Sequence, residues 1–148
     1  MSTPPNALLL QAEEFLRSAD ATRAKHPKDR LVILYLYGHA VELALKAVQL
    51  ASGVSHKSLK KDFGHDIAML VDAMKPQASN KKPLLTLLDR DELIFKALSP
   101  DYRAKRLEYV QYETIYSGPK IPDLRDACHR LMCEVNVHLR KSRVSGSA

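Results

Sequence analysis

One stretch, from Leu31 to Ala51, constrains the fold of this chain more than any other: it reads LVILYLYGHAVELALKAVQLA. It is long enough for about six helical turns, and a helix that is apolar on nearly all sides belongs in a protein core. Polar groups buried there need partners, so they must be satisfied by other helices or a second subunit, or else line a cleft. At about 100° per residue, they fall on a single stripe along the helix: Tyr35, His39, Glu42, Lys46 and Gln49.

The same stretch approaches the length of a membrane span, but its polar side chains argue against that interpretation. His39, Glu42 and Lys46 would be costly to place in lipid. We therefore expect a core helix and no membrane partner. Residues 1–6 lack the basic and apolar regions of a secretory signal, which favours a cytoplasmic location.

The two cysteines, Cys128 and Cys133, also favour the cytoplasm. On one helix their side chains point about 140° apart and cannot bridge each other. Thiols without a disulfide framework are typical of a reducing compartment, and we expect both to be buried and inert. No spacing of Cys and His completes a metal site, and no phosphate loop or dinucleotide fingerprint is present, so we expect neither a metal nor a cofactor.

The rest of the chain is predicted to be helical as well, because it contains only five glycines and no sustained alternation of β-branched residues. We expect an all-α, antiparallel bundle of about five helices. The domain spans 7–141, between an N-terminal arm at 1–6 and a flexible tail at 142–148. A basic loop is expected over 54–64 and turns over 101–122. Apolar stripes, prolines and capping residues place the helices at about 7–25, 31–51, 65–74, 83–98 and 123–141.

Two short motifs carry a resemblance to a known family. Residues 39–46 read HAVELALK, and after a loop residues 64–67 read GHDI at the start of the next helix. The pair resembles the HEPN domains (higher eukaryotes and prokaryotes nucleotide-binding), and the helix order is similar over residues 7–141. The resemblance implies a compact helical bundle that is often dimeric. It also implies one of three activities: RNA-cleaving toxin, nucleotide-binding partner of a small nucleotidyltransferase, or RNA-processing module.

The family's active ribonucleases carry an Arg, then four to six residues, then a His near a late helix. In this chain Arg125 and His129 have only three residues between them. They are the candidate catalytic pair, because His can take a 2′-hydroxyl proton and Arg can stabilise phosphorane charge. Arg125 and His129 still share one helical face, but relative to the family's spacing the shorter one is expected to rotate one side chain out of a shared site, which argues against cleavage. The alternative is that both lie on a solvated helix face.

Six further residues are candidates for ligand binding, each with a structural alternative. Glu42 and Lys46 are spaced for an ion pair within a helix, in the core or at a dimer interface, and otherwise for a polar cleft wall. The histidines are more often structural hydrogen-bonding groups than acids or bases. Asp66 suits the positive end of a helix. The full set is Tyr35, His39, Glu42, Lys46, His65 and Asp66.

The net charge of +6 permits an anionic partner. We therefore expect a HEPN-like module that binds RNA, a nucleotide or a partner protein, and that is a homodimer with weak or no enzymatic activity. Two alternatives stay open. The chain could be a metal-independent endoribonuclease of a toxin–antitoxin or defence system, partnered by a nucleotidyltransferase or antitoxin, or it could be a purely structural assembly protein.

Overall fold

Helices account for all the regular secondary structure in the residues that the structure, a computed structural model, describes. These are residues 4–76, 82–103 and 118–146, with only the backbone described over 99–103 and 142–146. They contain six α-helices and a π-helix packed against one another, and no strand. The prediction of an all-α helical bundle is confirmed.

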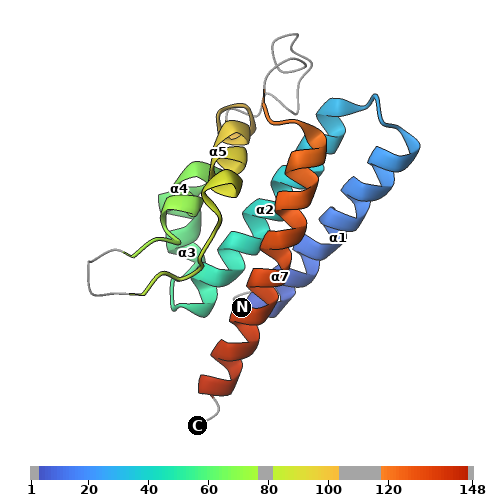
Figure 1. The fold of residues 1–148 in the computed structure, drawn as a ribbon. Coiled ribbons are helices and arrows are strands. Elements are labelled where there is room, and N and C mark those ends of the chain that lie inside the picture. Colours follow the sequence, from blue (N-terminus) through green and yellow to red (C-terminus); the bar gives the residue numbers. More distant parts are fainter. Residues whose placement is uncertain (1–3, 77–81, 104–117, 147–148) are drawn as a thin grey trace.

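Three long helices lie side by side along most of the molecule (Figure 1): α1 (Pro5–Lys25), α2 (Arg30–Ala51) and α7 (Ile121–Gly146). The short connection at 26–29 makes α1 and α2 antiparallel neighbours, as the sequence predicts, and their contact is the most extensive in the described bundle. Two shorter helices, α4 (Ile67–Asp72) and α5 (Asp89–Arg103), pack against another side of α2. This arrangement leaves α2 surrounded.

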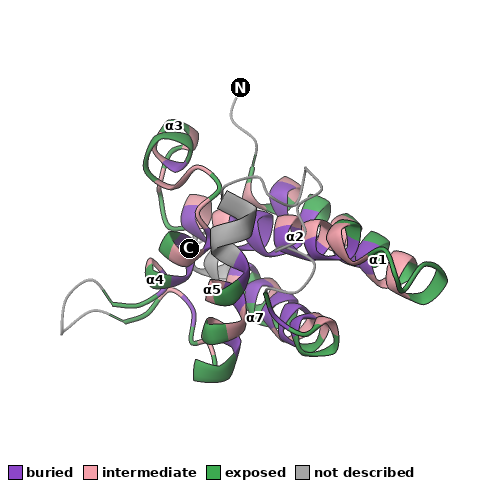
Figure 2. Cartoon of the chain, turned by 90° about the horizontal axis from the view of Figure 1, so that it is seen from above, coloured by how far each residue is buried: buried purple, intermediate pink, exposed green. Residues whose placement is uncertain are grey.

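Helix α2 is the core of the bundle (Figure 2), and most of its residues from Ile33 to Gln49 are buried. By length and composition alone this helix could cross a membrane, but 67% of its apolar window is buried inside the protein. The core helix of a soluble protein can have the same length and apolar composition as a membrane span, so these two properties alone do not indicate a membrane helix. Two polar side chains of α2 are nevertheless almost fully buried, Glu42 at 2% and Gln49 at 4% exposure.

The segment after α2 differs from the expected basic loop. Gly53 ends α2 with a φ of 101°, which a residue with a Cβ rarely adopts. A helical turn, α3 (His56–Ser58), then follows, and the Ser55 side chain caps it by accepting the Ser58 amide at 3.1 Å. The chain continues as a π-helix, η1 (Leu59–Phe63), before α4. The prediction of a loop was wrong, since the segment is helical from His56 to Phe63 and the Leu59 side chain within it is buried.

The expected bounds of the last two helices were also wrong. Helix α5 begins at Asp89, where three acidic side chains favour the positive end of the helix dipole, and not at Pro83. It continues through Pro100 to Arg103, since a proline removes one backbone hydrogen bond without always ending a helix. Helix α7 starts at Ile121 and extends to Gly146, so residues 142–146 are helical where a tail was expected. Residues 104–117 lie outside the described part.

A partly buried ion pair joins α5 to α7. Arg130 donates from Nε and NH2 to the two carboxylate oxygens of Asp91, at 2.9 and 2.7 Å. The Asp91 side chain is only 5% exposed, whereas Arg130 is 36% exposed. The two parallel hydrogen bonds satisfy a carboxylate that would otherwise be buried at high cost.

Candidate functional site

The candidate residues gather into two polar clusters on different faces of α2. We call the first the Glu42 cluster; it consists of His39, Glu42, Lys46 and His65. We call the second the Asp20 cluster; it consists of Asp20, Tyr37, Arg125 and His129. Both are built from side chains of separate helices or loops, so each depends on the fold.

In the Glu42 cluster, three basic side chains surround one buried carboxylate. Lys46 Nζ donates to Glu42 Oε2 at 2.6 Å, and His65 Nδ1 lies 3.0 Å from Oε2 and 3.2 Å from Oε1. His39 Nδ1 is farther, at 3.5 Å from Oε1. Exposure rises outward from 2% for Glu42 to 15% for Lys46 and 51% for His65. The polar stripe of α2 is thus partnered at its centre by the loop that precedes α4.

The other candidates near this cluster have supporting positions. Tyr35 stacks near His39, with ring centroids 5.9 Å apart, and Phe15 of α1 meets the His39 ring edge-on at 4.4 Å. Asp66 caps α4 by accepting the Met69 amide at 3.1 Å. His65 is a hydrogen-bonding group, as expected, and its partner is the Glu42 carboxylate.

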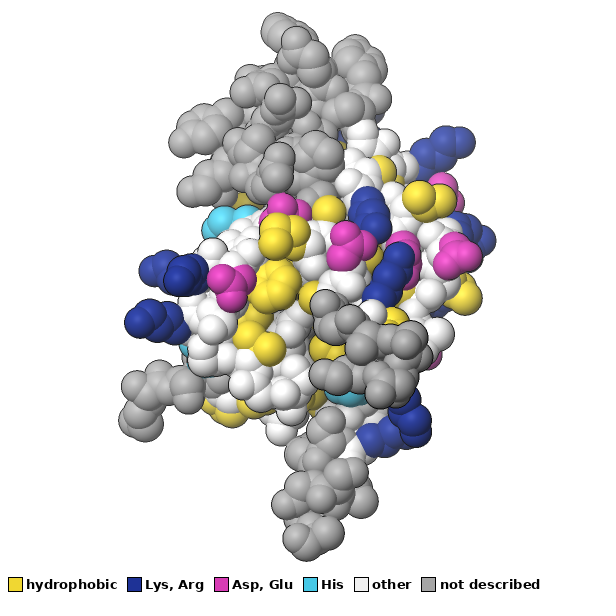
Figure 3. All heavy atoms as spheres, turned by 90° about the vertical axis from the view of Figure 1, so that its left-hand side faces the viewer, with side chains coloured by type: hydrophobic (Ala, Val, Ile, Leu, Met, Phe, Trp, Pro, Cys, Tyr) yellow, Lys and Arg dark blue, Asp and Glu magenta, His cyan; other side chains and the backbone are white. Residues whose placement is uncertain are grey.

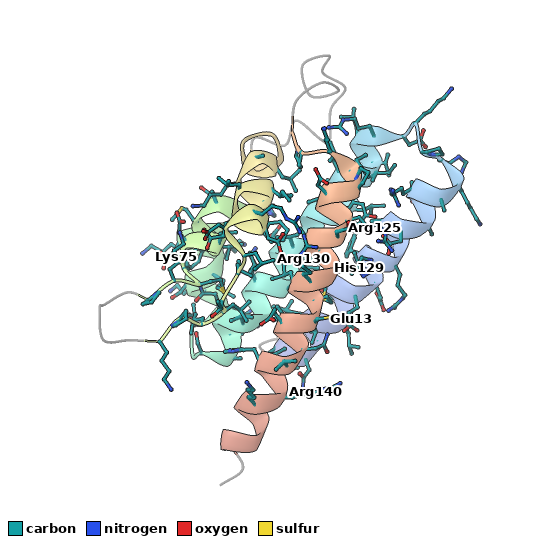
Figure 4. The ribbon with its side chains drawn as sticks, in the orientation of Figure 1. Glu13, Lys75, Arg125, His129, Arg130 and Arg140 are labelled. Carbon is teal, nitrogen blue, oxygen red and sulfur yellow. The ribbon has the colours of Figure 1, made fainter. Side chains whose placement is uncertain are left out.

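The Asp20 cluster joins three helices through one carboxylate. His129 Nε2 of α7 lies 2.7 Å from Asp20 Oδ2, and the Tyr37 hydroxyl of α2 donates to Oδ1 at 2.5 Å. Arg125 Nε is 3.6 Å from Oδ1, and its NH1 donates to Asp126 at 3.1 Å. Figure 4 shows Arg125 and His129 one above the other on the side of α7 toward α1.

Arg125 and His129 lie on one face of α7, as their spacing predicts, while the expected departure from the ribonuclease site of the HEPN family stays a prediction. A spacing of four places both on one face of a helix, and Asp20 contacts both. Exposures of 40% for Arg125 and 43% for His129 are compatible with the alternative of a solvated helix face, but both side chains are also paired with Asp20 of α1. Half exposure combined with a fixed orientation is what a binding or catalytic group requires.

Burial sets the acid–base properties of the groups behind this cluster. Tyr37 is fully buried, and its pKa is raised well above that of a free tyrosine, first by burial and then by the hydrogen bond and charge of Asp20. Burial, followed by the charges of Asp20 and Asp91, also raises the pKa of the Cys128 thiol. Cys128 is buried, as expected, but Cys133 is exposed.

Asp20 and Tyr37 were not among the residues predicted from sequence. Asp20 lies on the polar face of α1, where nothing distinguishes it from the charged residues around it. Tyr37 offered a weak signal: a tyrosine on an apolar face of a core helix needs a partner for its hydroxyl. Which residue supplies that partner depends on how α1 packs against α2.

Within the described ranges, no three His, Cys, Asp or Glu side chains are grouped so that they could hold a metal ion. Comparison of the chain with models of known protein families, with curated proteins and with solved structures found no match. The geometry of the two clusters is thus the basis for a functional hypothesis.

Replacing Lys46 tests whether the Glu42 cluster is a buried, paired network. We expect Lys46→Ala to lower the free energy of unfolding by about 2 kcal/mol, because Glu42 loses its shortest partner while it stays buried. The exposed Lys25 of α1 provides the control Lys25→Ala, which should change stability little. Urea denaturation measures both variants, and a Lys46→Ala midpoint equal to that of the wild type would contradict the pairing.

Tyr37→Phe tests the hydrogen bond to Asp20 and has a distinct dependence on pH. At pH 7 we expect a loss of about 1–2 kcal/mol, since Asp20 loses a donor. The raised pKa of Tyr37 means that its contribution is complete below the free-tyrosine pKa of about 10 and is lost as the pH rises further. Above pH ~10 the wild type should therefore lose stability more steeply than Tyr37→Phe. Parallel slopes of stability against pH in that range would show that Tyr37 ionises alike in the folded and unfolded chains.

Proposed function

We propose that the chain is a cytoplasmic, HEPN-like helical module that binds the phosphate groups of RNA or of a nucleotide at the Asp20 cluster. One observation carries the proposal. Arg125 and His129 are one helical turn apart, each is about two-fifths exposed, and one carboxylate orients both. Arg and His side chains held in this way are suited to phosphate oxygens, because they present charge-assisted donors at low cost in side-chain entropy.

A hollow beside the cluster supports a ligand larger than phosphate. It has a volume of about 430 Å³ and lies between α7 and the segment that leads into α5. His129 and Arg130 line one wall, and much of the remaining surface is leucine, including Leu87 and Leu131. An apolar hollow with a few convergent polar groups is typical of small-molecule sites. A base could enter this hollow while its phosphate contacts Arg125 and His129.

The second candidate function is metal-independent RNA cleavage, and the Asp20–His129 bond favours it. A carboxylate that holds an imidazole at 2.7 Å fixes the orientation of the ring, as in general-base catalysis. Arg125, on the same face, could stabilise the charge that develops on phosphorus. The Arg–His spacing is nevertheless shorter than in the ribonucleases of the family, so we place binding before cleavage.

We further propose a homodimer, with a nucleotidyltransferase or an antitoxin as the alternative partner. Large apolar side chains are exposed on α4 and α5, where Met69 is 46% and Leu93 is 70% exposed. Figure 3, which views the α3–α4 side of the bundle, shows hydrophobic side chains gathered near the middle of that face with charged ones around them. Apolar patches with polar rims are typical of protein interfaces.

Binding is tested with a fluorescent single-stranded RNA of mixed sequence in the presence of EDTA. We expect Arg125→Ala and His129→Ala each to weaken binding, measured by anisotropy, roughly tenfold, or ~1.4 kcal/mol. Arg140→Ala is the control, because this exposed arginine lies on α7 far from the cluster (Figure 4). It should weaken binding far less, through the loss of one charge.

The same samples, run on a denaturing gel, decide between the alternatives. Intact RNA in every lane, together with the expected binding losses, supports a binding module. Cleavage by the wild type and by Arg140→Ala, but not by the two cluster variants, would favour the ribonuclease. If the wild type binds neither the RNA nor nucleotides tested in the same way, the result would favour the purely structural assembly protein.

The dimer is tested by light scattering at micromolar concentration. We expect a mass of twice the 16.6 kDa of one chain and expect Leu93→Glu to reduce it to that of a monomer, because the charge would be buried in the interface. Leu10→Glu is the matched control, since Leu10 is 61% exposed on α1. A wild-type mass of 16.6 kDa would contradict the dimer.

A further inference from the structure

A second hollow, of about 980 Å³, lies at the C-terminal end of α2, away from both clusters. Its walls come from the last turn of α2, from the α3–η1 segment and from α4. The residues that bear on its chemistry are Gln49, Ser52, Ser55, Phe63 and Met69.

Gln49 is the unusual group in this hollow. Its side chain lines the hollow although the residue is only 4% exposed. In the part of the chain that the structure describes, no hydrogen bond joins its amide group to another residue. The amide atoms are also not among the buried side-chain atoms without a partner, so they reach solvent in the hollow. Its backbone oxygen, in contrast, is well used, since it accepts from the Ser52 hydroxyl at 2.7 Å and from the Val54 amide at 3.1 Å.

The other polar residues of the α2 stripe differ from Gln49, because their polar atoms have partners within the protein, whereas the amide of Gln49 is open to solvent in the hollow. Glu42 and Lys46 satisfy each other, and His39 approaches Glu42. The stripe thus ends in a side chain that offers one acceptor oxygen and two N–H donors beside open space. These groups match a ligand that carries a donor and an acceptor side by side.

The surroundings of Gln49 favour a neutral, flat ligand. Phe63 and Met69 present aromatic and thioether groups, which pack well on ring faces. The charges on the α4 wall are already paired with α5, through Asp72–Lys96 at 2.7 Å and Lys75–Glu92 at 3.0 Å. Asp62 and Lys82, which also line the hollow, carry one charge of each sign, so the lining as a whole has no strong preference for a charged ligand.

We propose that this hollow binds a neutral, planar cyclic amide, with the ring N–H and C=O of the ligand exchanging two hydrogen bonds with the Gln49 side chain. Phe63 and Met69 cover the ring, and the Ser52 and Ser55 hydroxyls lie within the same hollow. The proposal is independent of phosphate binding at the Asp20 cluster, because the two sites share no residue.

Two small probes isolate the amide edge of the ligand. 2-Pyridone carries both the donor and the acceptor, whereas N-methyl-2-pyridone has the same ring and carbonyl but no N–H. We expect 2-pyridone to bind the ¹⁵N-labelled full chain saturably, to shift the side-chain amide signals of Gln49, and to bind at least tenfold more tightly than the methylated probe. Equal binding of the two, or saturation by neither, would overturn the proposal.

Gln49→Met keeps the length of the side chain and removes its amide. Because the amide is unpaired in the free protein, we expect this variant to be at least as stable as the wild type and to bind 2-pyridone at least tenfold more weakly. The control is Gln11→Met, which removes an exposed amide on α1 and should leave binding unchanged. A marked fall in the denaturation midpoint of Gln49→Met would reveal a partner for the amide, and undiminished binding would show that it does not contact the ligand. Either result would overturn the proposal.

Discussion

The burial of α2 is the constraint on which the rest of this structure depends. A helix enclosed on several sides cannot leave its polar atoms to water, so neighbouring elements must provide partners for them. Helix α1 provides Asp20 for the Tyr37 hydroxyl, and the loop before α4 provides His65 for Glu42. Both polar clusters therefore arise where the core helix carries a group that only tertiary contacts can satisfy, and these contacts also fix how the surrounding elements dock.

Much of the fold could be predicted from the sequence, because its signals are local. The apolar run of α2 predicts a core helix, and the break at 26–29 predicts an antiparallel neighbour. The errors arose where a local signal competes with packing or with the helix dipole. Pro83 is a typical helix start and Pro100 a typical helix stop. Helix α5 nevertheless begins at the acidic residues at 89–92, and Pro100 is accommodated within it. The segment at 54–64 is polar in sequence, but it forms helical turns in which Leu59 is buried.

The candidate sites could be predicted only in part, for a related reason. Helical periodicity places His39, Glu42 and Lys46 on one stripe, and Arg125 and His129 on one face, since these relations lie within a helix. It cannot indicate that Asp20, far away in the sequence, meets His129 and Tyr37, or that His65 turns toward Glu42. It also cannot distinguish Gln49 from its partnered neighbours on the stripe, because that difference depends on the elements that pack around it.

The position of Asp20 among three helices has a thermodynamic consequence. Its carboxylate bonds His129 of α7 and Tyr37 of α2 from its own place on α1. A ligand that takes His129 away from Asp20 breaks a hydrogen bond between α1 and α7. The free energy of that bond is then lost from the packing of the two helices, and it lowers the affinity for the ligand by the same amount. Occupancy of the α7 surface and the mutual docking of the three long helices are therefore reciprocally linked, so that whatever tightens the bundle at Asp20 also opposes the release of His129.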